Sequence, residues 1–270
     1  MKTLMFICSL LLCGSMNADD FHSKVSETIH RSDSIPGTLK NDIAKTWETL
    51  VQEGVIEVSS TDKDVRPVFV GLQGVVEHVL ATELQTEIQS LKGVIHTPMP
   101  ATPLCMNGDI SKELVDPSIE MDPNRLFTVK ARATILRDYL FKGADLYVVY
   151  PKDGLLQRTE EQRAVYKQEL MKFPTHLFDV PLDCEEIPNE LIGATYFFQD
   201  QTGKTFVFAI QMTQAKDPQE MGHFGLWFGP LESPAIQKRA QAVSLYLKQN
   251  GLELNVKELA ESSIFFKEGV

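Results

Sequence analysis

Cys184 and His223 are the two residues of this sequence whose chemistry suits nucleophilic catalysis. Cys184 lies in the acidic stretch 183–186 (DCEE), and His223 follows 39 residues later in the stretch 222–226 (GHFGL). A thiol at the start of a helix gains thiolate character from the helix dipole, and a histidine on a strand can act as its base. If the fold brings them together, the pair predicts a cysteine hydrolase.

The order of the two motifs is similar to that in exported cell-wall peptidases of the papain-like NlpC type. The resemblance covers these two short motifs, and it implies that Cys184 is the nucleophile and His223 the base. The sequence departs from the family where Glu185 replaces the serine after the cysteine, and it lacks the family's tryptophan-glycine segment. A negative charge beside a thiol opposes thiolate formation. The interpretation that we favour is a structural cysteine and a histidine that opens a strand.

Four aromatic residues form a candidate binding surface. Tyr196 and Phe198 lie in one aromatic and β-branched run, and Phe224 and Trp227 lie in a later one. On an exposed sheet face these side chains would line a groove for a peptide or a hydrophobic ligand. In a covered sheet they would belong to the core, which is the commoner place for such residues.

Cofactor and metal motifs are missing from the sequence. Residues 203–205 (GKT) look like the end of a phosphate-binding loop, but Phe198 stands where that loop needs a glycine, so a hairpin turn is predicted. There is no H-E-x-x-H, G-x-S-x-G or C-x-x-C motif and no acidic calcium loop. His30, His78 and His96 each stand alone, which is typical of non-ligating histidines. We therefore expect neither a cofactor nor a metal ion.

The composition is that of a globular protein, with 43% hydrophobic and 23% charged residues in a chain of 270. The 26 basic and 37 acidic residues give a formal net charge of −11. Binding to nucleic acid or to an anionic membrane surface needs an excess of Lys and Arg, so neither partner is expected. An unknown protein or a component of the cell envelope is the expected partner.

Residues 1–18 have the pattern of a secretory signal peptide. Lys2 precedes an apolar run at 4–12, and small residues follow it. The run is shorter than the roughly 20 residues that cross a bilayer, and no later run reaches that length. We expect an exported bacterial protein, periplasmic or secreted, whose mature chain begins near Asp19 and has no transmembrane segment.

Three cysteines leave further questions open. Residues 10–15 (LLLCGS) resemble a bacterial lipobox, so a lipid anchor at Cys13 is an alternative, although Leu12 is large where lipoboxes carry a small residue. The mature chain retains Cys105 and Cys184. In an oxidising compartment they either form a disulfide or remain as two thiols, and the sequence does not decide between these states.

The first half of the mature chain reads as mainly helical. Residues 19–36 are polar and predict a flexible leader. Residues 37–95 predict a small helical region: two amphipathic helices, the second from Val76 to Leu91 and closed by Gly93, with short strands at 55–58 and 67–72. Residues 96–122 are rich in proline and predict a loop or linker, which is the best candidate for a domain boundary.

Residues 123–270 predict a mixed α and β domain. The expected elements are a helix over 123–141, a strand over 144–151, a helix over 159–173, a strand over 176–182, a hairpin over 192–213, a strand over 223–231, a helix capped by Ser233, and a terminal helix from Asn255. The two strands around the helix at 159–173 predict a parallel unit.

The expected fold is α+β, also described as mixed α/β. It has a three- or four-stranded mixed, mostly antiparallel sheet backed by helices, and a helical N-terminal part. Because export is indicated and catalytic motifs are lacking, we expect a non-enzymatic binding or accessory protein that works through the strands at 192–231. Two alternatives remain: the NlpC-type cysteine hydrolase with Cys184 and His223, and a secreted effector that acts on a host cell.

Overall fold

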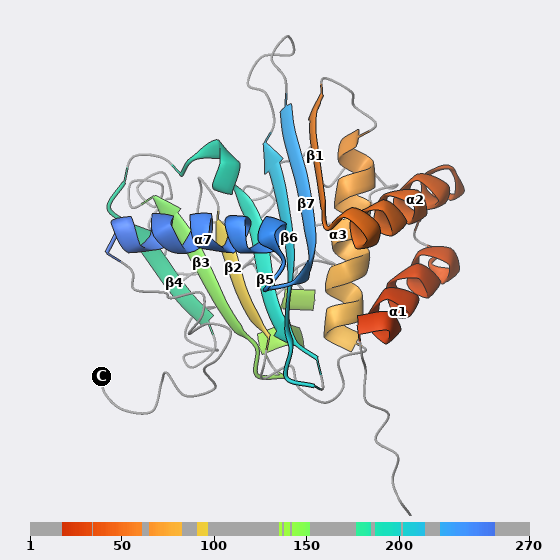
Figure 1. Cartoon of the computed structure of the whole chain (residues 1–270), viewed down its shortest axis with the longest axis horizontal. Helices are drawn as coiled ribbons and strands as arrows, with labels where there is room; N and C mark the ends of the chain where they lie inside the picture. Colours follow the sequence, from red (N-terminus) through yellow and green to blue (C-terminus); the bar gives the residue numbers. More distant parts are fainter. Residues whose placement is uncertain are drawn as a thin grey trace, which may run out of the picture.

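One seven-stranded mixed sheet lies at the centre of the computed structural model (Figure 1). The structure describes residues 18–33, 35–60, 65–82, 91–96, 135–136, 138–140, 142–151, 177–184, 187–200, 202–213 and 222–251. The strands are β1 (Val55–Ser60), β2 (Lys92–His96), β3 (Asp145–Pro151), β4 (Leu177–Leu182), β5 (Gly193–Gln199), β6 (Thr205–Thr213) and β7 (Gly222–Pro230). Their order is β1-β7-β6-β5-β2-β3-β4, with β2, β3 and β4 parallel and all other neighbours antiparallel.

Helices cover both faces of this sheet. They are α1 (Ala18–Arg31), α2 (Gly37–Glu53), α3 (Val65–Thr82), the short 3₁₀ helix η4 (Asn189–Leu191) and α7 (Pro234–Gln249). Helices α1, α2 and α3 contact one another and pack on one face, whereas α7 crosses the other (Figure 1). Because side chains alternate along a strand, each strand contributes to two separate hydrophobic cores.

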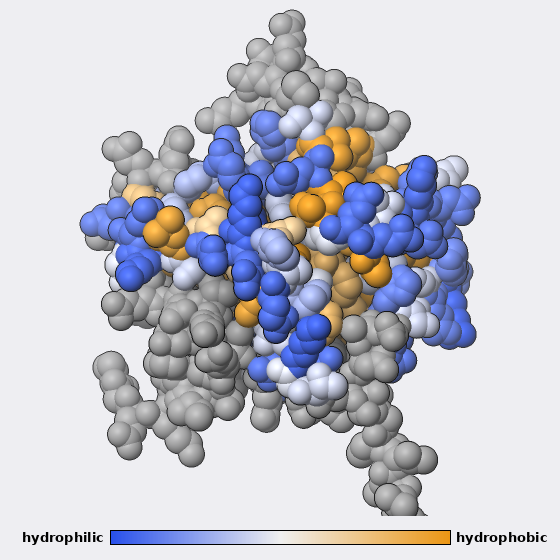
Figure 2. Space-filling model, in the orientation of Figure 1, coloured by the Kyte–Doolittle hydropathy of each residue, from blue (hydrophilic) through white to orange (hydrophobic). Residues whose placement is uncertain are grey.

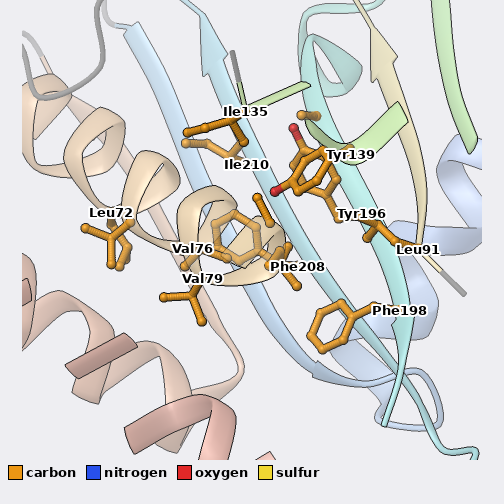
Figure 3. Close-up of a cluster of buried hydrophobic side chains, with 14 of the residues drawn as sticks. Leu72, Val76, Val79, Leu91, Ile135, Tyr139, Tyr196, Phe198, Phe208 and Ile210 are labelled. Carbon is orange, nitrogen blue, oxygen red and sulfur yellow. The ribbon is translucent and has the colours of Figure 1, made fainter. Parts of the chain in front are cut away.

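The larger core lies between the sheet and α1 to α3. Figure 3 shows Leu72, Val76 and Val79 of α3 facing aromatic side chains of β5 and β6. Trp47 of α2 is fully buried, and its ring centroid lies 4.8 Å from that of Phe228 on β7. Aromatic packing of this kind fixes the three helices against the strands.

Glu77 brings a carboxylate into this core, where polar partners satisfy it. Tyr196 donates a hydrogen bond to Glu77 Oε1 at 2.6 Å, and Gln73 Nε2 donates to the same oxygen at 2.7 Å. The hydroxyl of Tyr139 donates to the backbone carbonyl of Glu77. Buried carboxylates persist when they are hydrogen-bonded in this way, so Glu77 joins α3 to β5 as a structural group.

The sheet is larger than the predicted three or four strands. Strand β1 pairs with β7, with Val55 opposite Trp227, and β2 lies between β5 and β3. Strand β1 confirms the short strand predicted at 55–58, and β2 lies just after the residues predicted as the second helix. Both strands precede the proline-rich stretch 96–122 and pair with strands that follow it, so this stretch does not divide the strands into two sheets. Each pairing joins residues far apart in sequence, and local hydrophobic patterns carry no information about such partners.

The predicted flexible leader at 19–36 contains a helix instead. Helix α1 spans Ala18–Arg31 and buries Phe21, Val25 and Ile29. These residues recur every four positions among polar neighbours, which places them on one side of a helix. The prediction was wrong because only three apolar residues form the buried side of this otherwise polar helix.

The second predicted helix is displaced toward the N-terminus. Residues 67–72, expected as a strand, lie inside α3, and Pro67 is the third residue of that helix. A proline is tolerated there because the first N–H groups of a helix have no partner within it. Gly93, expected to close the helix, lies in β2, where an added Cβ would stand 2.5 Å from Leu146 Cδ2.

The second half of the chain follows its predicted strands. Strands β3 and β4 are parallel, β5 and β6 form the predicted hairpin, and β7 pairs with β6. Asp200 Oδ1 accepts from the backbone N–H of Thr202 at 2.8 Å and of Lys204 at 3.0 Å, so Gly203 and Lys204 lie in a hairpin turn and Thr205 begins β6. The helices predicted over 159–173 and from Asn255 lie outside the described residues.

Helix α7 covers the second core. It begins at Pro234 after Ser233, as predicted, but the Ser233 side chain makes no capping hydrogen bond. Ile236, Val243 and Leu247 are fully buried against the sheet. Figure 2 views the molecule from this side, where the outer surface of α7 is mostly hydrophilic.

Candidate functional site

Cys184 and His223 do not meet. His223 lies on β7, second from one edge of the sheet, whereas Cys184 follows β4 at the opposite edge. Five interstrand spacings separate these strands, or about 24 Å. The structure therefore contradicts a catalytic pair made of these two residues.

Each of the two residues has a different partner. Cys184 is a free thiol, half-buried, and its Sγ lies 3.3 Å from the hydroxyl of Tyr246 on α7. His223 is exposed, and its Nδ1 lies 2.9 Å from Ser59 Oγ across the β1–β7 pair. The Ser59–His223 contact is a cross-strand pair of two exposed side chains, and we assign it to strand pairing. Cys105 and Cys13 lie outside the described residues.

The four aromatic residues predicted as a binding surface belong to the cores. Tyr196, Phe198 and Phe224 lie under α1 to α3, and Trp227 lies on the α7 face. Their exposed fractions run from 0% to 7%, which leaves no aromatic groove among them. The reason is that helices cover both faces of the strands that carry them.

The α7 side of the sheet holds several buried polar groups without partners. They are both ring nitrogens of His96, the hydroxyl of Thr195, and Nε and Nη2 of Arg239. Within the described ranges, no other buried side-chain nitrogen or oxygen lacks a hydrogen bond. These residues are 0% to 6% exposed, so bulk water does not replace the missing partners. Such groups cost about 1–3 kcal/mol each when left unpaired, which makes their occurrence on one side of the sheet informative.

Three elements place these groups on one face. His96 ends β2 and Thr195 lies in β5, opposite Val94, so the two side chains point to the same side of neighbouring strands. Arg239 lies in the second turn of α7, three residues after the buried Ile236 and four before the buried Val243, which turns it toward the sheet. We call His96, Thr195, Trp227 and Arg239 the α7 site.

Arg239 is held in a fixed position. Its guanidinium carbon lies 4.5 Å from the ring centroid of Trp227, and its Nη1 donates to the backbone carbonyl of Glu190 in η4. Burial lowers the pKa of Arg239 to about 10, an effect that Glu57 and Glu190 partly offset. The side chain is therefore charged at neutral pH. A buried cation that makes a single side-chain hydrogen bond lacks full compensation.

Gly225 allows the Trp227 ring to lie under Arg239. A Cβ at Gly225 would stand 2.3 Å from Trp227 Cη2, so the indole rests directly on the glycine backbone. Guanidinium groups stack on aromatic faces with an attraction of about 0.5–2 kcal/mol. The glycine thus makes room for the ring that orients the arginine.

His96 remains neutral in this environment. Burial and, to a smaller extent, the charge of Arg239 lower the pKa of His96 to about 3. Its ring centroid lies 6.3 Å from that of Tyr246, whose own pKa is raised by burial and by the hydrogen bond with Cys184. A neutral imidazole has one donor and one acceptor, and neither has a hydrogen-bond partner among the residues that the structure describes.

The α7 site lies where parallel and antiparallel parts of the sheet meet. His96 is at the carboxyl end of β2, which pairs in parallel with β3 and antiparallel with β5. The unpaired donors and acceptors of the α7 site can form hydrogen bonds with a small polar molecule.

Sequence reasoning did not identify this site. His96 stands alone in the sequence, and Thr195 carries no local signal. Arg239 did carry one, because its helical spacing from Ile236 and Val243 puts a charge on the inward face of α7. An inward charge on an amphipathic helix indicates a buried polar partner.

No described group of three or more His, Cys, Asp or Glu side chains could hold a metal ion. Among the helices within the described ranges, none is long and apolar enough to span a membrane. Comparison with models of protein families, with curated protein sequences and with solved structures finds no match.

Proposed function

We propose that this chain is an exported, non-enzymatic binding protein of a bacterial envelope or its surroundings, and that it holds a small polar molecule in the α7 site. The observation that supports the proposal is the set of five unpaired polar atoms of His96, Thr195 and Arg239 on the α7 side of the sheet. Proteins retain uncompensated polar groups in a core chiefly where function needs them, because the same positions filled by apolar residues are more stable. The ligand supplies the missing partners.

A comparison of two isosteric substitutions tests whether the hydroxyl of Thr195 lacks a partner. Thr195→Val removes that hydroxyl and should raise the free energy of unfolding of the ligand-free chain by about 1 kcal/mol. Thr213→Val is the matched control on β6, since its hydroxyl bonds both the N–H and the carbonyl of His223, and it should lower stability by about 1 kcal/mol. Urea unfolding measures both values. Equal destabilisation of the two variants would show that Thr195 is already paired, for example by a buried water.

Binding itself is tested by titrating the full chain with a panel of small neutral, anionic and cationic molecules while NMR spectra are recorded. At least one class should shift signals of β2, β5 and α7 together. Thr195→Val should weaken that ligand several-fold, and Thr213→Val should leave its affinity unchanged. A panel that leaves all three elements unperturbed would overturn the proposed function.

Export rests on residues 1–18, of which 1–17 lie outside the described residues. The mature chain that remains would include nearly all of α1, whose side chains Phe21, Val25 and Ile29 contribute to the core. We expect the intact mass of the native protein to correspond to a chain that begins near Asp19. A native protein that retains Met1 would contradict export, and a mass that begins at lipidated Cys13 would instead show a membrane anchor.

A further inference from the structure

The two unpaired nitrogens of Arg239 indicate which chemical class of ligand fits the α7 site. This inference rests on the proposed function, in which the α7 site binds a small molecule. A guanidinium presents donors along three sides of a plane. Nη1 is engaged by the Glu190 carbonyl, and one face of the plane rests on Trp227. The remaining donors, Nε and Nη2, lie along a single edge and have no partner. That edge is the one with which an arginine holds two oxygens of a carboxylate or phosphate in parallel hydrogen bonds.

The charges around this edge distinguish between these two anions. Glu57 and Glu190 act on Arg239 as nearby negative charges, and His96 adds no positive charge because it is neutral. Among the described side chains of the α7 site, Arg239 is therefore the single cation. A monoanion brings one negative charge to this cation, whereas a dianion would place a second negative charge beside Glu57 and Glu190 in a buried position.

The other unpaired groups suit the same ligand. Thr195 supplies a hydroxyl donor and His96 a ring N–H, and a carboxylate has lone pairs left over after a bidentate contact with arginine. The stacked ring of Trp227 fixes Arg239 before the ligand arrives, so little side-chain entropy is lost on binding. We infer that the ligand of the α7 site is a small monovalent carboxylate, bound side-on through Nε and Nη2 of Arg239 with His96 and Thr195 as further donors.

The inference is tested on the ¹⁵N-labelled full chain by following the Nε–H resonance of Arg239. The probes are sodium acetate, acetamide and sodium phosphate at matched ionic strength and pH 8, where phosphate is mostly the dianion and Arg239 is still charged. Acetate should shift this resonance saturably, with at least tenfold tighter binding than acetamide or phosphate. Acetamide has nearly the shape of acetate without its charge, and phosphate carries more charge on a similar arrangement of oxygens.

Variants connect the acetate signal to the proposed contact. Arg239→Lys keeps the charge and loses the two-donor edge, so acetate affinity, read from the amide signals of β2 and β5, should fall at least tenfold. Arg31→Lys, at an exposed arginine of α1, controls for the same replacement and should leave affinity unchanged. If Arg239→Lys does not fold, Thr195→Val provides the second variant, with an expected loss of several-fold.

The possible failures are distinguishable. If acetamide or phosphate binds as well as acetate, the carboxylate class is overturned while the α7 site remains a binding site. If acetate binds equally well to Arg239→Lys, the side-on contact is wrong. If none of the three probes moves the Arg239 resonance, the carboxylate class is likewise overturned, and the wider panel of small molecules decides independently whether the site binds any ligand.

Discussion

Gly193→Ala should destabilise the protein by about 4 kcal/mol. Gly193 opens β5 at a φ of +148°, where residues with a Cβ are strained by about 1–3 kcal/mol. An added Cβ would also stand 1.9 Å from the carbonyl oxygen of Ile210, on the backbone of β6. Overpacking against atoms that cannot rotate away adds about 1–3 kcal/mol. Urea unfolding monitored by circular dichroism measures the loss.

Substitutions at two other glycines separate the effect of backbone strain from that of the clash with β6. Gly203→Ala introduces a Cβ at a φ of +80° with no atom within 4 Å, so it should show the backbone strain alone, about 1–2 kcal/mol. Gly37→Ala has open space and no positive φ at the start of α2, so its stability should stay within about 0.5 kcal/mol of wild type. A Gly193→Ala variant no less stable than Gly203→Ala would show that β6 moves away from the new methyl group.

The second large effect is a loss of stability with falling pH that originates at His96. The unfolded chain binds a proton at this histidine near pH 6.5, while burial holds the pKa in the folded protein at about 3. Stability from the neutral, buried ring is therefore fully present above pH 6.5 and is lost as the pH falls toward 3. The slope is about 1.4 kcal/mol per pH unit, or roughly 2.5 kcal/mol between pH 6 and pH 4.

The difference between wild type and a variant isolates this contribution from that of the acidic residues. His96→Leu cannot take up the proton, so its free energy of unfolding should fall less steeply than that of wild type between pH 6 and pH 4. His78→Gln, on the exposed side of α3, controls for the removal of a histidine and should follow the wild-type curve. Parallel curves for wild type and His96→Leu would show that the folded protein accepts a proton at His96.

Elements with strong local signals were predictable from the sequence. The hairpin of β5 and β6 has two β-branched and aromatic runs around a turn, and α7 has a proline at its first position. Helix α1 was missed because its apolar residues are few. The extent of the sheet was missed for a different reason, since β1 and β2 are short and find partners that no local pattern identifies.

The α7 site also combines a feature with a local sequence signal and features that depend on distant segments. The inward position of Arg239 follows from helical spacing, whereas its place on the same side of the sheet as His96 and Thr195 depends on three segments that are brought together only by the complete sheet. Cys184 and His223, in contrast, have suitable chemistry but are not brought together by the fold. Their residue types suggested a partnership, but the strand order places them near opposite edges. Residue type alone therefore does not identify a site in this protein.

The pairing of β1 with β7 also bears on the time course of synthesis. Val55 can pair with Trp227 only after the ribosome has added 172 further residues, and β2 can pair with β5 only after a similarly long segment has been synthesised. Contacts between such distant segments form slowly, since a long loop must close before any favourable contact is gained. A nascent chain that has not yet produced β5 to β7 cannot complete this architecture. If the protein is exported, that delay would keep the chain without its complete sheet while it passes through a translocation channel.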